Sequence, residues 1–181
     1  MRVRVVWGLM AAIVVVGTGV FPACTNGEGM PFGGPEEVEF AEALWAAMGG
    51  YQGWLMKSDY TPGGSPHGDF VRLYYNMVSV GETPYHVIVK DNFGGEGSTL
   101  AALPEEADTR LMAVTVMAQR EAGYDEENGN WFWAKYDADG TVSANDQGVV
   151  LAGRVAKGST MGCIACHANA QGGDYLFTND R

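Results

Sequence analysis

Residues 70–90, FVRLYYNMVSVGETPYHVIVK, decide the fold class of this chain. Both ends of the segment are rich in aromatic and β-branched residues, which favour strands. The turn Gly81-Glu82-Thr83-Pro84 lies between them and carries the residue types that reverse a chain. The segment therefore predicts an antiparallel hairpin formed by strands 70–80 and 85–90.

Segments on both sides extend this hairpin into a sheet. Further strands are predicted at 111–118 and 131–136, and the turn 137–140 (DADG) leads to a short strand at 141–142. Before the hairpin, a short helical piece around 51–56 and a loop over 58–69 are expected.

A helix is predicted in front of the sheet. Pro35 followed by Glu36 and Glu37 suits a helix start, and Gly49-Gly50 suits its end. Together the elements predict an α+β domain that is mainly antiparallel β, with one four- to five-stranded sheet and an N-terminal helix.

The first residues resemble a targeting segment. Arg2 and Arg4 precede an uncharged run, and small Ala23 stands before Cys24, so residues 1–23 are predicted to be a signal peptide. Cys24 could carry the lipid of a bacterial lipoprotein; an ordinary cleavage nearby or an uncleaved anchor are the alternatives. The expected location is the periplasm, with membrane contact only through a lipid on Cys24. Residues 24–34 are predicted to be a flexible tether, and residues 35–181 the folded domain.

Charge narrows the possible partners. The chain has 181 residues, 22 acidic and 11 basic side chains, and a formal net charge of −11. Nucleic acid is not an expected partner, because no basic stripe exists that could displace phosphate counterions. A basic cytochrome is a suitable redox partner for such an acidic protein.

The motif Cys163-Ile164-Ala165-Cys166-His167 indicates which cofactor the protein binds. CxxCH is the attachment signature of c-type haem, in which both thiols bond one porphyrin and the histidine binds its iron. A thioredoxin-like redox pair would come earlier in the chain, and structural zinc would need four ligands, for which only His67 and His86 are left. One covalent haem c per chain is therefore predicted, in a segment close to the C-terminus.

The second axial position of the iron decides between functions. A strong ligand there makes an electron carrier, whereas an open position permits gas binding or catalysis. His67, His86 and the methionines are the candidates. Alternation places His86 on the same face of its strand as Ile88 and Lys90, which makes it the least poor candidate.

The order of these pieces resembles the cytochrome P-460 family, which includes the cytochromes c′-beta. The matching pieces run from His67 to Phe177: HG at 67–68, VRLY at 71–74, VIVK at 87–90, M at 117, REAGYD at 120–125, GNW at 129–131, Y at 136, the CxxCH, and DYLF at 174–177.

The resemblance implies an antiparallel sheet packed as a homodimer and a five-coordinate haem iron. In the hydroxylamine-oxidising members, a lysine at the end of the second strand is joined to the porphyrin, and Lys90 occupies the matching place. Those members also carry a distal carboxylate, whereas the segment 111–118 has no Asp or Glu and places Thr115 at the corresponding position. Glu121 and Asp125 follow and are expected to be solvated loop residues.

Three functions follow from the motif and the resemblance. The first is oxidation of hydroxylamine or a related small nitrogen oxide, with Lys90 tuning the haem. The second is non-catalytic binding of nitric oxide, with a pocket of aromatics such as Phe70, Tyr74 or Trp133. The third is electron transfer with a side chain as sixth ligand.

Overall fold

The computed structural model describes residues 30–177 as an α+β domain with a single six-stranded sheet. The signal peptide predicted for residues 1–23 and Cys24 lie outside the described residues. The elements, in chain order, are α1 (Pro35–Ala47), η1 (Tyr51–Gly53), β1 (Leu55–Pro62), β2 (Phe70–Val80), β3 (Thr83–Phe93), α2 (Leu103–Arg110), β4 (Leu111–Gln119), η2 (Glu126–Asn128), β5 (Trp131–Asp137), β6 (Ala152–Gly153), α3 (Cys163–His167) and η3 (Gln171–Gly173).

The sheet is an antiparallel meander with the strand order β1-β2-β3-β4-β5-β6. The predicted hairpin forms β2 and β3, in continuous register from Phe70 opposite Phe93 to Val80 opposite Thr83. Asp137–Gly140 forms the predicted turn, in which Gly140 N donates to Asp137 O over 3.0 Å. The predicted fold class is confirmed, although the sheet has six strands.

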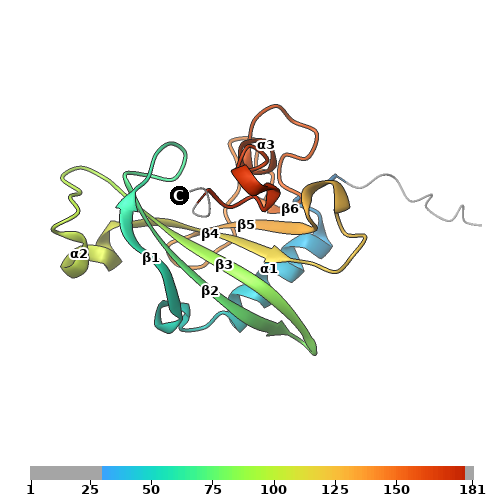
Figure 1. The fold of residues 1–181 in the computed structure, drawn as a ribbon, viewed down its shortest axis with the longest axis horizontal. Coiled ribbons are helices and arrows are strands. Elements are labelled where there is room, and N and C mark those ends of the chain that lie inside the picture. Colours follow the sequence, from blue (N-terminus) through green and yellow to red (C-terminus); the bar gives the residue numbers. More distant parts are fainter. Residues whose placement is uncertain (1–29, 178–181) are drawn as a thin grey trace, which may run out of the picture.

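Each face of the sheet is covered by a different part of the chain (Figure 1). Helix α1 buries Ala41 and Leu44 on one face, against alternate residues of β2 to β5. Helix α3 and the segment after it pack on the opposite face. This second face is called the motif face below, and its core consists of Val71, Leu73, Ile88, Met117, Trp131, Trp133, Val155 and Ile164.

Helix α1 begins and ends where the sequence predicts. Pro35 is at its start, Glu36 and Glu37 lie in its first turn, and Gly50 follows it with φ of +75°. Tyr136 from the sheet donates a hydrogen bond to Ala41 O over 2.7 Å, which fixes the helix on this face.

Leu44 provides a test of how much this helix contributes to stability. Its side chain is 0% exposed, so Leu44→Ala is expected to leave a cavity and lower the free energy of unfolding by about 2–5 kcal/mol. Urea denaturation followed by circular dichroism measures the change. Glu42→Ala, an exposed substitution on the same helix, is the control and should change the free energy by less than about 0.5 kcal/mol. A loss as small for Leu44→Ala would contradict the packing described here.

The segment before the hairpin agrees with the prediction only in part. The expected helical piece around 51–56 is present as η1, but β1 occupies its last residues and the first residues of the predicted loop 58–69. Strand β1 pairs with β2 through Met56 opposite Tyr74 and Thr61 opposite Val71. The sequence of β1 does not alternate between apolar and polar residues, which is why it was not predicted as a strand. The strand lies at the edge of the sheet and its pairing is interrupted by register shifts. Helix α2 was not predicted, because its eight residues bury only Leu103.

The end of the predicted tether is ordered as well. Phe32 forms an antiparallel bridge with Gly153, and Gly33 N donates to Ala152 O over 2.7 Å. The folded domain therefore includes residues before Pro35, because a sheet edge provides the hydrogen bonds that the tether sequence itself cannot make. Within residues 30–177, no helix is long and apolar enough to cross a membrane.

Candidate haem site

The predicted site residues gather on the motif face. Helix α3 contains Cys163, Cys166 and His167, and its only buried residue, Ile164, packs against the sheet. Lys90 lies on β3, with its backbone paired to Leu73 and Thr115. Strand alternation places Lys90 on the same face as buried Ile88, so its amine faces the motif.

His167 has the orientation that a metal ligand requires. Its Nδ1 lies 2.7 Å from Tyr175 O, and a carbonyl oxygen can only accept, so Nδ1 carries the proton. The lone pair is therefore on Nε2, which is the usual arrangement of a ligating histidine and its supporting carbonyl. The ring also lies 4.9 Å from Trp133, centre to centre. Burial lowers the pKa of His167 to about 4, and nearby Lys90 adds to this effect, so the imidazole is neutral at pH 7.

The two thiols are spaced for one prosthetic group. Cys163 and Cys166 are both free, and they are separated by one turn of α3, so they lie on the same side of the helix. Burial raises the pKa of Cys163, while Lys90 acts in the opposite direction. Two free thiols beside a neutral, oriented imidazole are the donor set of a covalent haem, so these residues fit the group.

Lys90 is held in an unusual environment for a lysine. Burial lowers its pKa to about 8, although the charges of Cys163 and Cys166 nearby act to raise it. Its amine is therefore neutral in a much larger fraction of molecules than that of an exposed lysine, and a neutral amine is a nucleophile.

None of the residues in the cross-strand row of Lys90 is a carboxylate. Leu73, Thr115 and Lys135 form the cross-strand row with Lys90, and Asp91 points to the opposite face, where Tyr51 donates to it over 2.7 Å. Asn92, one step along the motif face, donates to Thr115 Oγ1 over 3.2 Å.

His67 lies at this site, although the sequence named it only as one of several candidates and favoured His86. Its ring centre lies 6.1 Å from that of His167. Burial lowers the pKa of His67 to about 3, with further contributions from Lys90 and His167. Asn92 lies close enough to favour the charged imidazole, but no hydrogen bond of good geometry joins them, and Asn92 Oδ1 is a buried acceptor without a partner.

His86 is on the motif face but away from the motif. Its backbone pairs with Met77 and Gln119, and its ring lies 6.1 Å from Trp131. Among the described residues, no three His, Cys, Asp or Glu side chains gather in a way that could hold a metal ion without a porphyrin.

Two of the three aromatics expected around a ligand lie elsewhere. Tyr74 packs in the core beneath α1, and alternation places Phe70 on that same face. Trp133 does lie on the motif face, beside His167. The sequence predicted aromatic residues near the ligand, but which face of the sheet each of them occupies depends on how the strands pair.

Asp125 is buried, contrary to the prediction of a solvated loop residue. Lys157 Nζ lies 2.5 Å from Asp125 Oδ1, and Asn128 donates to Asp125 Oδ2 over 2.9 Å. Tyr175 donates from its hydroxyl to Glu127 O over 3.2 Å in the same loop. This loop therefore binds Lys157, which lies in the segment before α3, and Tyr175, whose carbonyl oxygen accepts from His167.

This ion pair gives a stability prediction. Asp125 has a fully buried side chain, so Lys157→Met is expected to leave a buried carboxylate without its main partner and to lower the free energy of unfolding by about 1–3 kcal/mol. Chemical denaturation at pH 7 measures the effect. Lys57→Met removes an exposed lysine of β1 and should change the stability by less than about 0.5 kcal/mol. Equal effects of the two substitutions would show that the buried pair does not matter.

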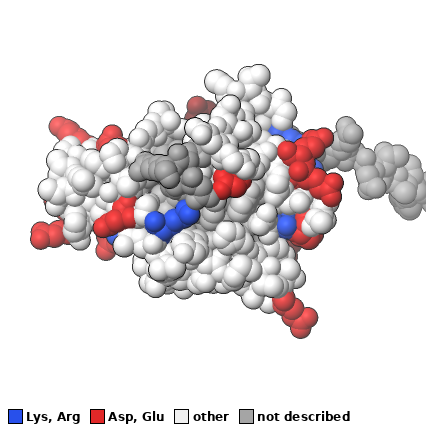
Figure 2. Space-filling view, in the orientation of Figure 1, with Lys and Arg blue, Asp and Glu red and all other residues white. Residues whose placement is uncertain are grey.

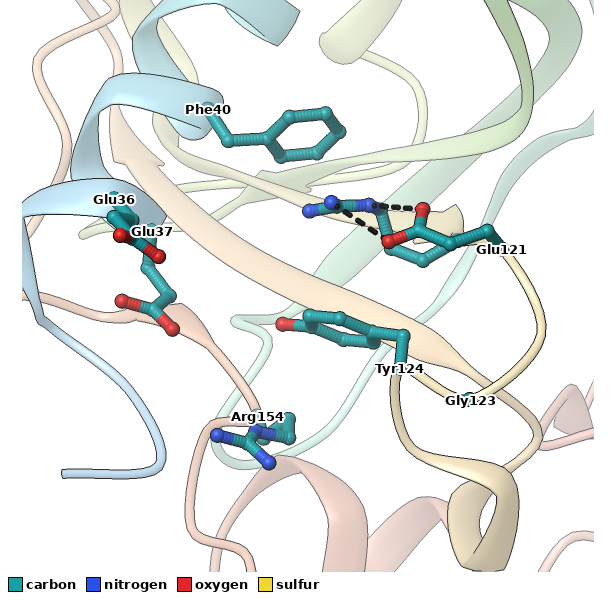
Figure 3. A pocket seen from close by; sticks show the side chains of 8 residues that line it. Glu36, Glu37, Phe40, Glu121, Gly123, Tyr124 and Arg154 are labelled. Atoms are coloured by element: carbon teal, nitrogen blue, oxygen red, sulfur yellow. Dashed lines mark hydrogen bonds and ion pairs between the residues drawn. The ribbon is translucent and has the colours of Figure 1, made fainter. Parts of the chain in front are cut away.

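A cavity on the α1 side of the sheet does not belong to this site. It has a volume of about 400 Å³ and is lined by Glu36, Glu37, Phe40, Arg120, Glu121, Gly123, Tyr124 and Arg154 (Figure 3). Arg120 stacks 4.1 Å from the centre of Phe40 and binds Glu121 through two hydrogen bonds of 3.0 and 3.1 Å. It contains no sulfur or imidazole ligand, so Glu121 is separated from the motif face.

Comparison with known proteins agrees with this geometry. A family model described as Cytochrome P460 matches residues 50–178, which include the sheet, Lys90 and the CxxCH helix. No curated protein and no solved structure matches the chain. The family is one of cytochromes, so haem iron is the cofactor. The chain belongs to the cytochrome P460 family.

Proposed function

We propose that the protein is an exported cytochrome with one covalent haem c, which oxidises hydroxylamine or a related small nitrogen oxide. The observation that carries this proposal is the position of Lys90, whose partly neutral amine faces the same site as Cys163, Cys166 and His167. A lysine in this position can form the haem link that the resemblance implies for the hydroxylamine-oxidising members.

Each residue of the site would have a different role. Cys163 and Cys166 would hold the haem through thioether bonds, and His167 Nε2 would bind the iron, oriented by the hydrogen bond from Nδ1 to Tyr175 O. When bound, the haem supplies an iron that accepts electrons from the nitrogen substrate. Trp133 packs against the His167 ring and excludes water from it.

The electrons must leave the protein for an acceptor, and we propose a basic cytochrome. Acidic side chains are spread over the face seen in Figure 2, and basic ones are few there. The net charge of −11 supports the attraction of a positively charged partner at low ionic strength. Export to the periplasm, a lipid on Cys24 and a homodimer are further parts of this proposal, supported by the sequence of residues 1–24 and by the resemblance.

A second candidate function is binding of nitric oxide without turnover. The row of Leu73, Lys90, Thr115 and Lys135 favours it, because it contains no carboxylate that could accept a proton from hydroxylamine. In this case Lys90 would be unlinked, and the haem would serve as a gas receptor.

The absorption spectrum of the purified protein tests the choice between these functions. A broad and strongly red-shifted Soret band after reduction with dithionite is expected, because a lysine link changes the conjugation of the porphyrin. Oxidation of hydroxylamine should then be measurable with an artificial electron acceptor. An ordinary Soret position without turnover would reject the oxidase and favour the nitric oxide receptor.

A further inference from the structure

Tyr175 contacts His167 through its backbone and a distant turn through its side chain. Its carbonyl oxygen lies 2.7 Å from His167 Nδ1. Its hydroxyl donates to Glu127 O over 3.2 Å and lies 3.4 Å from Asn128 Oδ1, although these residues are 48 and 47 positions away in the sequence. One tyrosine therefore connects the histidine of the CxxCH to the loop between β4 and β5.

The backbone of Tyr175 depends on contacts from outside its own segment. Its φ is +66°, in the left-handed region that residues other than glycine seldom adopt. Tyr175 follows η3 and lies in no helix or strand, so no regular ladder of hydrogen bonds fixes the direction of its carbonyl group. Such a conformation persists where the surrounding structure holds it in place.

The turn that receives the Tyr175 side chain is itself well fixed. Asp125 is 3% exposed, and its carbonyl oxygen accepts from Asn128 N over 2.9 Å and from Asn130 N over 2.8 Å. A Cβ at Gly129 would lie 3.5 Å from Tyr175 Cε2, so the tyrosine ring lies against the main chain of this turn. The turn formed by residues 125–130 can therefore serve as a support for Tyr175.

The orientation of the His167 ring depends on the contact with Tyr175. The ring centres of Trp133 and Phe177 lie 4.9 and 5.5 Å from that of His167, and such ring contacts limit where the imidazole lies. The hydrogen bond to Tyr175 O is directional, so it decides how the imidazole is turned and which nitrogen holds the proton.

From these contacts we infer that Tyr175 is a positioning residue for His167, and that its hydroxyl, bound to the 125–130 turn, keeps its carbonyl oxygen on Nδ1. A carbonyl held in this position polarises the N–H bond and makes Nε2 a stronger donor to a bound iron. Donor strength of the axial ligand is one of the means by which a protein sets the reduction potential of a haem. The inference rests on the proposed covalent haem and on His167 as its iron ligand.

Tyr75 on β2 provides a matched control. It is a partly buried tyrosine that packs against the same motif-face core, and its ring centre lies 5.9 Å from Lys57 Nζ. Tyr75→Phe removes the same hydroxyl group from the same core as Tyr175→Phe. A general effect of losing a tyrosine hydroxyl would appear in both variants, whereas loss of the support for His167 would appear in Tyr175→Phe alone.

Resonance Raman spectra and the reduction potential of the holoprotein test the inference. In ferrous Tyr175→Phe the iron–histidine stretching band is expected at a lower frequency than in the wild type, and the reduction potential is expected to be higher. Tyr75→Phe should match the wild type in both measurements. A wild-type band and potential in Tyr175→Phe would overturn the inference, because the carbonyl group would then keep its position without the hydroxyl.

Hydrogen exchange of the His167 Nδ1 proton gives a second readout that needs no turnover. Proton nuclear magnetic resonance of the ferric protein follows this proton after transfer to deuterated water. In Tyr175→Phe it should exchange about two- to tenfold faster than in the wild type, the ratio that corresponds to the net free energy of one hydrogen bond. Equal exchange rates in the wild type, Tyr175→Phe and Tyr75→Phe would contradict a role for the hydroxyl.

Turnover separates this inference from the proposed function. If the stretching band and the potential follow Tyr175 but the wild type does not oxidise hydroxylamine, the positioning role stands and the oxidase function fails. If hydroxylamine is oxidised while both quantities are independent of Tyr175, the reverse holds. A protein that binds no covalent haem would overturn both.

Discussion

Replacing Cys163 and Cys166 together by alanine is expected to abolish covalent haem attachment. The two thiols are the only cysteines among the described residues, and they lie one turn apart on α3 next to His167. Without them no thioether bond can form, so haem should be removed completely by denaturation and extraction. The measurement is haem staining of the denatured protein on a gel, together with its intact mass after co-expression with a haem-attachment system.

The control for this experiment is Met161→Leu. Met161 is 78% exposed and precedes the motif by two residues, so its replacement should leave the attached haem at the wild-type amount. Each single cysteine variant should keep at most one bond. Haem that remains covalently bound to the double variant at the wild-type level would show that another side chain provides the attachment.

Replacing Lys90 by leucine is expected to cause the second large effect. Leucine fills similar space on the motif face but cannot form a nitrogen–carbon bond to the porphyrin. The red-shifted reduced Soret band should return to an ordinary position, and kcat/KM for hydroxylamine should fall by about 100-fold or more, at the upper end of what loss of a tuning residue costs. Nitric oxide binding should be largely unchanged.

Lys135→Leu is the matched control for Lys90. Lys135 lies in the same cross-strand row, separated from Lys90 by Thr115. Its replacement removes an equal charge from the same face and should leave the Soret position unchanged. If Lys90→Leu kept the red shift, or if Lys135→Leu abolished it, the link would have been assigned to the wrong lysine.

Much of the sheet follows from local sequence. The hairpin of β2 and β3 has its turn residues and its strand residues in one continuous segment, so its register needs no distant information. Strand β1 was missed because it is an edge strand with few buried side chains, so apolar and polar residues do not alternate along it. Its extended conformation depends on pairing with β2. Asp125 was misjudged for a related reason, since its partner Lys157 is 32 positions away.

The sequence by itself predicted the donor set of the site, Cys163, Cys166 and His167, and the face of Lys90. The donor set depends on the spacing of three residues within the short helix α3, and the face of Lys90 depends on alternation along a single strand. Only the tertiary structure decided which histidine joins His167. The sequence favoured His86, which shares a strand face with Lys90, but the contact of the 63–69 loop with the end of β3 brings His67 to the motif instead. Such long-range contacts depend on packing and not on local spacing.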